Sequence, residues 1–100
     1  MIIRIFDTAM EPDDIEDAKK LFREDVRPAF ESFDGCHGVE MTIGVEEHSG
    51  DLVDVASLSR WDSLEAVQAA TATEEYQDAL AGIRKLFRQA PIVRHFELVD

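Results

Sequence analysis

Hydrophobic and polar positions along the chain follow two different periods. Near the N-terminus, Ile2, Ile3, Ile5 and Phe6 form an apolar run that is interrupted only by Arg4. Such a run predicts a strand over residues 2–8 that is covered on both of its faces. The following segment repeats its apolar residues every three or four positions, which predicts an amphipathic helix beginning near residue 12. The members of this stripe are Ile15, Ala18, Phe22, Val26, Phe30 and Phe33.

Proline and glycine mark the interruptions in this first half of the chain. Pro28 falls inside the helical stripe. Because proline lacks an amide hydrogen and its ring crowds the preceding turn, we expect a kink or break near Arg27. Gly35 and Gly38 then predict a turn over residues 34–38, since glycine tolerates positive φ angles.

The second half of the chain predicts a hairpin, two helices and a last strand. Apolar and polar residues alternate over 39–45 and 52–61, and the polar segment 46–51 joins them as a loop. Asp62 and Glu65 resemble a capping box for a short helix over about 63–70. A further cap at residues 71–74 precedes a longer helix that runs to about Arg88, and residues 92–99 form a final strand.

The resulting order is β-α-β-β-α-β, which predicts an α+β fold. It is the ferredoxin-like arrangement, an antiparallel sheet with both helices on one face, formed by a single domain over residues 1–100. Several strands carry apolar residues on both faces, so the uncovered face of the sheet would be a large apolar patch. We therefore predict a homodimer in which two sheets meet face to face and form an α/β barrel.

Composition excludes several classes of partner. The chain has 100 residues, and 22 acidic against 10 basic residues give it a formal charge of -12. This charge argues against nucleic acid and against anionic membranes as partners. A single cysteine allows no internal disulfide, the N-terminus does not read as a signal peptide, and no apolar run is long enough for a membrane span, so we expect a cytoplasmic protein.

The whole chain resembles the antibiotic-biosynthesis-monooxygenase-like (ABM) family of dimeric α/β barrels. The likeness rests on the opening strand at Met1, the turn Phe30–Gly38, the junction Arg60–Ala66, the pair Glu75-Tyr76 and the closing Phe96-Glu97. The resemblance implies a homodimer with a pocket between helices and sheet in each subunit. It also implies a cofactor-independent monooxygenase that acts on a small aromatic or quinol-like molecule, without a dedicated flavin or metal.

Four residues are candidates for the site. The resemblance implies that Trp61 faces the pocket, where its indole could stack on a flat ligand, although a core role is the alternative. Tyr76 lies on a helical stripe, and its hydroxyl could donate to a substrate carbonyl or phenolate. If its face of the last strand lines the pocket, His95 is the candidate general base, because its pKa is ordinarily near neutral; an ordinary satisfied or exposed histidine is the alternative. Arg4 could orient an anionic substrate or instead pair with a carboxylate such as Asp7.

Other residue types favour structural roles. His37, His48 and His95 occur singly, without the spacing of a metal site. Haem-degrading relatives carry an Asn on the first strand and a His after the tryptophan, whereas this chain has no Asn and no His between residues 49 and 94. The sequence thus argues against haem degradation. It leaves a second function open, a non-catalytic dimeric module that binds a small ligand or a protein.

Overall fold

The computed structural model describes residues 1–46 and 50–100, so the middle of the predicted 46–51 loop lies outside the described residues. The strands of this part of the chain are β1 (Ile2–Met10), β2 (Cys36–Ile43), β3 (Val53–Trp61) and β4 (Ile92–Glu97). The helical segments are a 3₁₀ turn (Pro12–Asp14), α1 (Ile15–Leu21), a π-helical turn (Phe22–Val26), α2 (Arg27–Ser32), α3 (Leu64–Thr71) and α4 (Glu74–Arg84).

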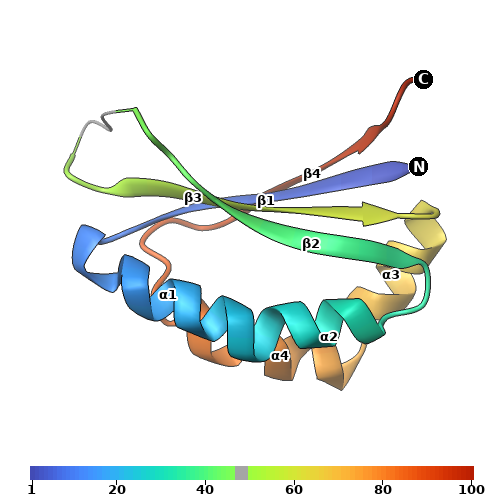
Figure 1. The fold of residues 1–100 in the computed structure, drawn as a ribbon, viewed down its shortest axis with the longest axis horizontal. Helices are drawn as coiled ribbons and strands as arrows, with labels where there is room; N and C mark the ends of the chain where they lie inside the picture. Colours follow the sequence, from blue (N-terminus) through green and yellow to red (C-terminus); the bar gives the residue numbers. More distant parts are fainter. Residues whose placement is uncertain (47–49) are drawn as a thin grey trace.

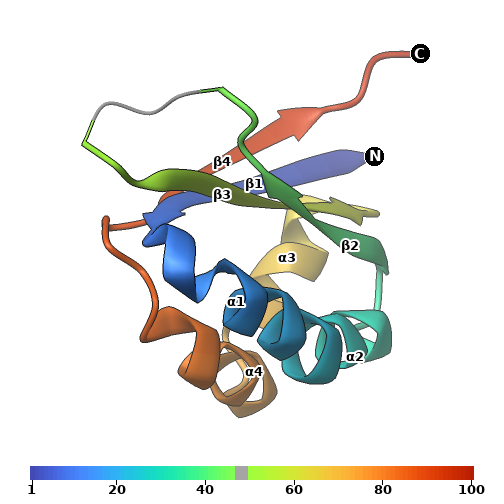
Figure 2. The ribbon, with the colours of Figure 1, turned by 60° about the vertical axis from the view of Figure 1, so that its left-hand side comes forward.

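The strands form one antiparallel sheet in the order β2-β3-β1-β4. All helices lie on the same side of this sheet, as the two views in Figures 1 and 2 show. Central strands β1 and β3 pair along their whole length, from Ile2 opposite Trp61 to Met10 opposite Val53. The predicted α+β, ferredoxin-like fold is therefore confirmed.

The first helix continues through Pro28, where the sequence predicted a kink or break. A π-helical turn over Phe22–Val26 comes directly before the proline, and the amide of Arg27 donates to the carbonyl of Phe22, five residues back. Widening the helix by one residue accommodates a proline ring that would crowd an ordinary α-helical turn. The helix thus continues past the proline, and the guanidinium carbon of Arg27 lies over the Phe22 ring, 5.0 Å from its centroid.

Several boundaries and one cap differ from the sequence-based expectation. Strand β1 continues to Met10 instead of ending at residue 8, and β2 spans Cys36–Ile43 where 39–45 was expected. Helix α4 ends at Arg84, not near Arg88, and β4 ends at Glu97. Ser63, not Asp62, is the N-cap of α3, because its hydroxyl accepts a hydrogen bond from the amide of Ala66. Thr73 caps α4 in the same way, as predicted. Serine and threonine serve here because their oxygens reach the free amides of a first helical turn.

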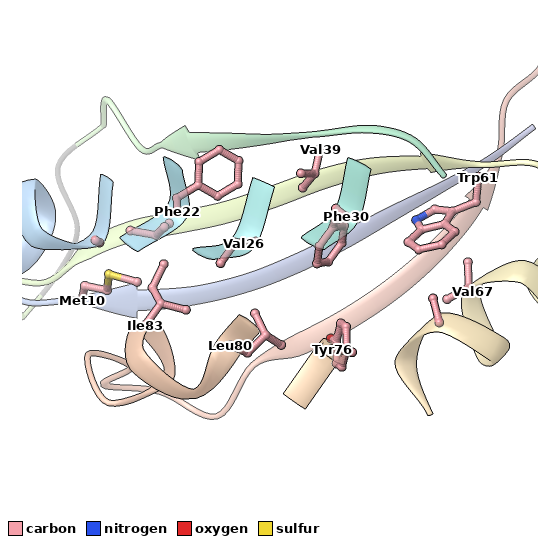
Figure 3. Packing of buried hydrophobic residues seen from close by; sticks show 13 residues of the cluster. Met10, Phe22, Val26, Phe30, Val39, Trp61, Val67, Tyr76, Leu80 and Ile83 are labelled. Atoms are coloured by element: carbon pink, nitrogen blue, oxygen red, sulfur yellow. The ribbon is translucent and has the colours of Figure 1, made fainter. Parts of the chain in front are cut away.

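The core fills the space between the helices and the sheet (Figure 3). Phe30 is its aromatic centre, since its ring centroid lies within about 6 Å of those of Phe33, Trp61 and Tyr76. Trp61 itself is completely buried. Even-numbered residues of β1 and odd-numbered residues of β3 face this core. Alternation had grouped the odd-numbered residues of β3 on one face without indicating which face is buried.

The opposite face of the sheet is not covered by any helix or strand of the described residues. Cross-strand partners point to the same side, so Ile3 lies beside Phe96, and Ile5 lies beside Leu58. Phe96 is 48% exposed, and every residue of β4 is exposed. An apolar face of this kind is typical of an interface between protein chains. Among the described residues, none of the helices combines the length and apolarity that crossing a bilayer requires.

Gly35 holds the turn between α2 and β2 against the start of α3. Its φ is +79°, and a Cβ added there would lie 2.8 Å from the Cβ of Ala66. We expect Gly35→Ala to lower the free energy of unfolding by about 2–4 kcal/mol, because backbone strain and a steric overlap add together. Urea unfolding followed by circular dichroism measures this loss.

Gly38→Ala is the matched control for that substitution. Gly38 also has a positive φ, +137°, but a Cβ there would meet nothing within 4 Å. Gly38→Ala should lower the free energy of unfolding by less than Gly35→Ala does, because it introduces backbone strain without a steric overlap. Equal losses in the two variants would contradict the role assigned to the contact with Ala66.

Candidate functional site

Arg4 is a buried cation at the centre of the sheet. It projects from β1 toward the helices and is 9% exposed. Its Nη2 donates to the hydroxyl oxygen of Tyr76 on α4, and its Nη1 lies 3.0 Å from Nε2 of His95 on β4. The structure therefore brings together three of the four predicted site residues, with Tyr76 and His95 lying 72 and 91 positions from Arg4 in the sequence.

The neutralising partner considered for Arg4 is not found. No carboxylate of the described residues makes an ion pair with it, and its contacts are neutral groups and the rings of Phe6 and Tyr76. A guanidinium stays protonated in proteins, and burial of an unpaired charge is costly. Arg4 is thus a positive charge that an anion or a carbonyl oxygen would complement.

The contact with Arg4 fixes the tautomer of His95. Arginine only donates hydrogen bonds, so Nε2 of His95 must accept, and the imidazole hydrogen resides on Nδ1. Burial of part of the ring lowers the pKa of His95 below its ordinary value, and the charge of Arg4 lowers it further. His95 is therefore a neutral base near pH 7, with its lone pair directed at Arg4.

The Tyr76 hydroxyl accepts a hydrogen bond from Arg4 and can still donate one of its own. Its oxygen accepts from Arg4 at 3.0 Å, which leaves its own O–H free to donate. The side chain is 6% exposed, and it lines a cavity between α4 and the sheet. Arg4 and Tyr76 together form a pair of donors at one end of this cavity.

The cavity itself is small and mostly apolar. It has a volume of about 40 Å³, which is room for about three water-sized groups. Beside Arg4 and Tyr76, its wall includes Phe22, Phe30 and Met41. A site of this composition favours the oxygen-bearing edge of an apolar molecule, because few polar groups converge in an otherwise apolar wall.

Trp61 lies outside the cavity wall. Its indole Nε1 donates to Oγ of Ser59 at 2.8 Å, and its ring packs against Phe30 and Phe33. This placement corresponds to the core role weighed for it in the sequence. Stacking of Trp61 on a ligand stays a prediction, since a ligand would have to displace these aromatic neighbours.

The remaining candidates have structural contacts. His37 forms a hydrogen bond with the carboxylate of exposed Asp62, which ties the turn before β2 to the start of α3. Burial raises the pKa of the Cys36 thiol, which disfavours a reactive thiolate. His48 lies outside the described residues. Within residues 1–46 and 50–100, no three His, Cys, Asp or Glu side chains gather as a metal site.

Sequence reasoning named Arg4, Tyr76 and His95 separately but not as a connected group. Their contacts depend on the pairing of Arg4 with His95 across β1 and β4 and on the way α4 packs on the sheet. It also missed the apolar wall around them, where Phe22 and Met41 are contributed by segments that the sequence assigned only to the core. The signal that could have found the group is a lone arginine in an otherwise apolar strand.

The fold and its buried donors define a small α+β protein with a cavity between helices and sheet. The family model described as Antibiotic biosynthesis monooxygenase matches residues 1–82. The chain therefore belongs to the antibiotic biosynthesis monooxygenase family. No curated protein matches the sequence.

Solved structures share the fold at low sequence identity. A protein from Bordetella bronchiseptica, named as a candidate antibiotic biosynthesis monooxygenase, is 20% identical, with a TM-score of 0.79 over 98% of this chain and 96% of its own. Rv0793 from Mycobacterium tuberculosis is 18% identical, with a TM-score of 0.68 over 99% and 95% of the two chains. PA3566 from Pseudomonas aeruginosa is 16% identical, with a TM-score of 0.67 over 99% and 94%. These likenesses show the fold alone.

The protonation of His95 tests the described geometry. Its ring should titrate below the ordinary histidine pKa of 6.5. In Arg4→Gln the pKa should rise, but it should stay below 6.5, because burial is the larger cause and remains. NMR titration of the histidine rings measures both values, and the His37 signals serve as a control because His37 contacts Asp62 instead of Arg4.

The same shift sets the sign of a stability effect. The unfolded chain protonates His95 at a higher pH than the folded protein does. The free energy of unfolding is therefore highest, as far as His95 is concerned, above about pH 6.5, and it falls as the pH drops toward the pKa of His95 in the folded protein. A His95 pKa at or above 6.5 in the folded protein would contradict the contact with Arg4.

Proposed function

We propose that this protein is a homodimeric monooxygenase that acts on a small aromatic or quinol-like molecule and needs no dedicated flavin or metal. The observation that carries the proposal is the buried cation of Arg4, which faces a mostly apolar cavity together with a free Tyr76 hydroxyl. Membership of the antibiotic biosynthesis monooxygenase family supports the reaction type. The aromatic or quinol-like substrate is what the resemblance to this family implies, and the donors Arg4 and Tyr76 fit the oxygen that such a molecule carries.

The proposed reaction balances without an external reductant. With an anthrone-type substrate, the ring methylene becomes a carbonyl. One atom of O₂ enters the product, and the other leaves as water with the two methylene hydrogens. The substrate supplies all four electrons, so the protein has only to bind it and favour its electron-rich enolate or phenolate form.

Arg4 and Tyr76 would stabilise that anionic form. Donors aimed at the atom where negative charge develops act strongly in an apolar site, because little water screens them. His95 lies outside the cavity wall, but its contact with Arg4 makes it the candidate that would take the substrate proton. A substrate oxygen that replaces His95 as the acceptor on Arg4 would free the Nε2 lone pair for this role. Trp61 would either keep its packing role in the core or, as the resemblance implies, stack on a ligand that displaces its aromatic neighbours.

The small cavity favours a specific alternative. A volume of about 40 Å³ lies far below the ~300 Å³ at which ordinary ligand pockets begin. A whole aromatic substrate would have to move the wall residues Phe22 and Met41. The alternative is a non-catalytic dimeric module that binds a small ligand or a protein partner.

Oxygen consumption separates these two functions. With a panel of quinols and anthrones, the wild type should consume O₂, and Tyr76→Phe and Arg4→Gln should each lower kcat/KM by about 100-fold, as loss of one oxyanion donor does. Trp61→Phe should lower the free energy of unfolding and leave kcat/KM near the wild-type value, because Trp61 packs in the core outside the cavity wall. An oxygen electrode and product mass spectrometry give these values.

Arg84→Gln is the control, because the Arg84 guanidinium bonds Gln77 on the surface of α4 and lines no cavity described here. It should turn over like the wild type. Absence of turnover with every substrate would favour the binding module, whereas wild-type kinetics in a Trp61→Phe, Tyr76→Phe, His95→Ala triple variant would refute the catalytic roles assigned to these residues.

The dimer is tested on the open face of the sheet. Phe96→Glu introduces a charge on that face and should convert a dimer into a monomer, as light scattering would show. Leu64→Glu is the matched control, since Leu64 is 44% exposed, close to the 48% of Phe96, but lies at the start of α3. A monomeric wild type at micromolar concentration would contradict the proposed barrel.

A further inference from the structure

A groove beside the cavity differs in charge from the rest of the molecule. It lies between the first helical segments and the edge strand β2 and has a volume of about 350 Å³. Three of the ten cationic side chains, Lys19, Arg23 and Arg27, line it. In a chain with a net charge of -12, such clustering makes this groove a local site of attraction for anions.

Two of these cations have no neutralising partner. Lys19 pairs with Glu16 at 3.1 Å, one helical turn away. Arg23 and Arg27, by contrast, make no ion pair with any carboxylate of the described residues. The groove also contains Glu40, whose carboxylate lies 3.7 Å from Arg60. The remaining positive charge is thus carried by two guanidinium groups.

The floor of the groove is apolar. Phe22, Met41 and Ile43 line it, and Arg27 lies over the ring of Phe22. This stack is a product of the π-helical turn, which aligns residues five positions apart. A flat apolar ligand with an acidic substituent would match such a wall, because the ring can pack on the floor while guanidinium groups hold the acid.

Phe22 and Met41 also belong to the wall of the buried cavity. These two side chains therefore separate the groove from the chamber of Arg4 and Tyr76, and Figure 3 shows Phe22 between the helix and β2. At about 350 Å³ the groove has the size of an ordinary small-ligand site, which the cavity lacks. Its walls lie on the helix side of the sheet, opposite the face proposed for the dimer.

We propose that this groove binds an aromatic carboxylate, with Arg23 and Arg27 on the carboxylate and Met41 and Ile43 under the ring, beside the Phe22 side chain that Arg27 already covers. The groove is then the route by which substrate reaches Arg4, and the substrate carries an acidic group distant from its reactive oxygen. The role of the groove as a substrate route rests on the proposed monooxygenase function, whereas binding of the carboxylate in the groove can be tested without turnover.

Direct binding tests the charge preference. Naphthalene-2-carboxylate and its neutral amide, naphthalene-2-carboxamide, are probes of the same shape. Calorimetric titration at low ionic strength should show the carboxylate binding at least about tenfold more tightly, the usual gain of one charge-assisted hydrogen bond. Added salt should reduce the difference. Equal affinity for the two probes would overturn the proposal.

Variants locate the effect. Arg23→Gln and Arg27→Gln should each lower the preference for the carboxylate, whereas Arg84→Gln should keep it, since each substitution removes one positive charge but only Arg84 lies outside the groove. Equal losses in all three variants would mean that only net charge matters, and wild-type binding in both Arg23→Gln and Arg27→Gln would overturn the assignment.

The methionines report where the probe binds. Met41 lines the groove and the cavity, Met10 lines only the cavity, and Met1 lines neither. With methyl-labelled methionine, the carboxylate should shift the Met41 signal and leave Met1 unchanged, even in a double variant Arg4→Gln, Tyr76→Phe that lacks the proposed oxyanion donors. A shift of Met41 without oxygen consumption by the wild type would refute the monooxygenase and keep the groove. Oxygen consumption without a shift of Met41 would refute the groove alone.

Discussion

Burial of the Arg4 guanidinium is the constraint on which the rest of the site depends. The group sits on the helix side of the sheet, at the level of the core aromatics, and only neutral partners surround it among the described residues. A lone buried cation costs stability unless its donors are satisfied. Tyr76 and His95 supply the two acceptors, and this fixes the packing of α4 on β1 as well as the tautomer of the imidazole.

The same arrangement prepares a site for a negative charge. Tyr76 and His95 each accept one hydrogen bond from Arg4 but leave its charge unbalanced. An anionic oxygen could replace the imidazole as acceptor and gain the Coulombic term in an apolar cavity. In the neighbouring groove, nearer the surface, the guanidinium groups of Arg23 and Arg27 are likewise positive charges without a carboxylate partner among the described residues. The overall acidity of the chain makes these positive regions stand out from the remaining surface.

The fold was predictable because its signals are local and consistent. Alternation in 39–45 and 52–61, the helical stripe of the first helix and the caps around residues 62 and 73 each specify one element, and the order of elements leaves few arrangements. The exact ends of α4 and β4 were not predictable, since helix ends depend on tertiary contacts. The sequence also showed that Pro28 disturbs the helix, but only the structure showed that a π-helical turn absorbs it.

The sequence by itself determined the strand and helix order, the acidic exterior and the presence of one arginine within an apolar strand. Tertiary structure decided which chemistry-bearing residues meet, because Arg4, Tyr76 and His95 come from three elements far apart in the chain. It also decided that Trp61 packs among phenylalanines with its indole nitrogen bonded to Ser59. Periodicity assigns a side chain to a face, but the neighbours on that face depend on strand register and on how the helices dock.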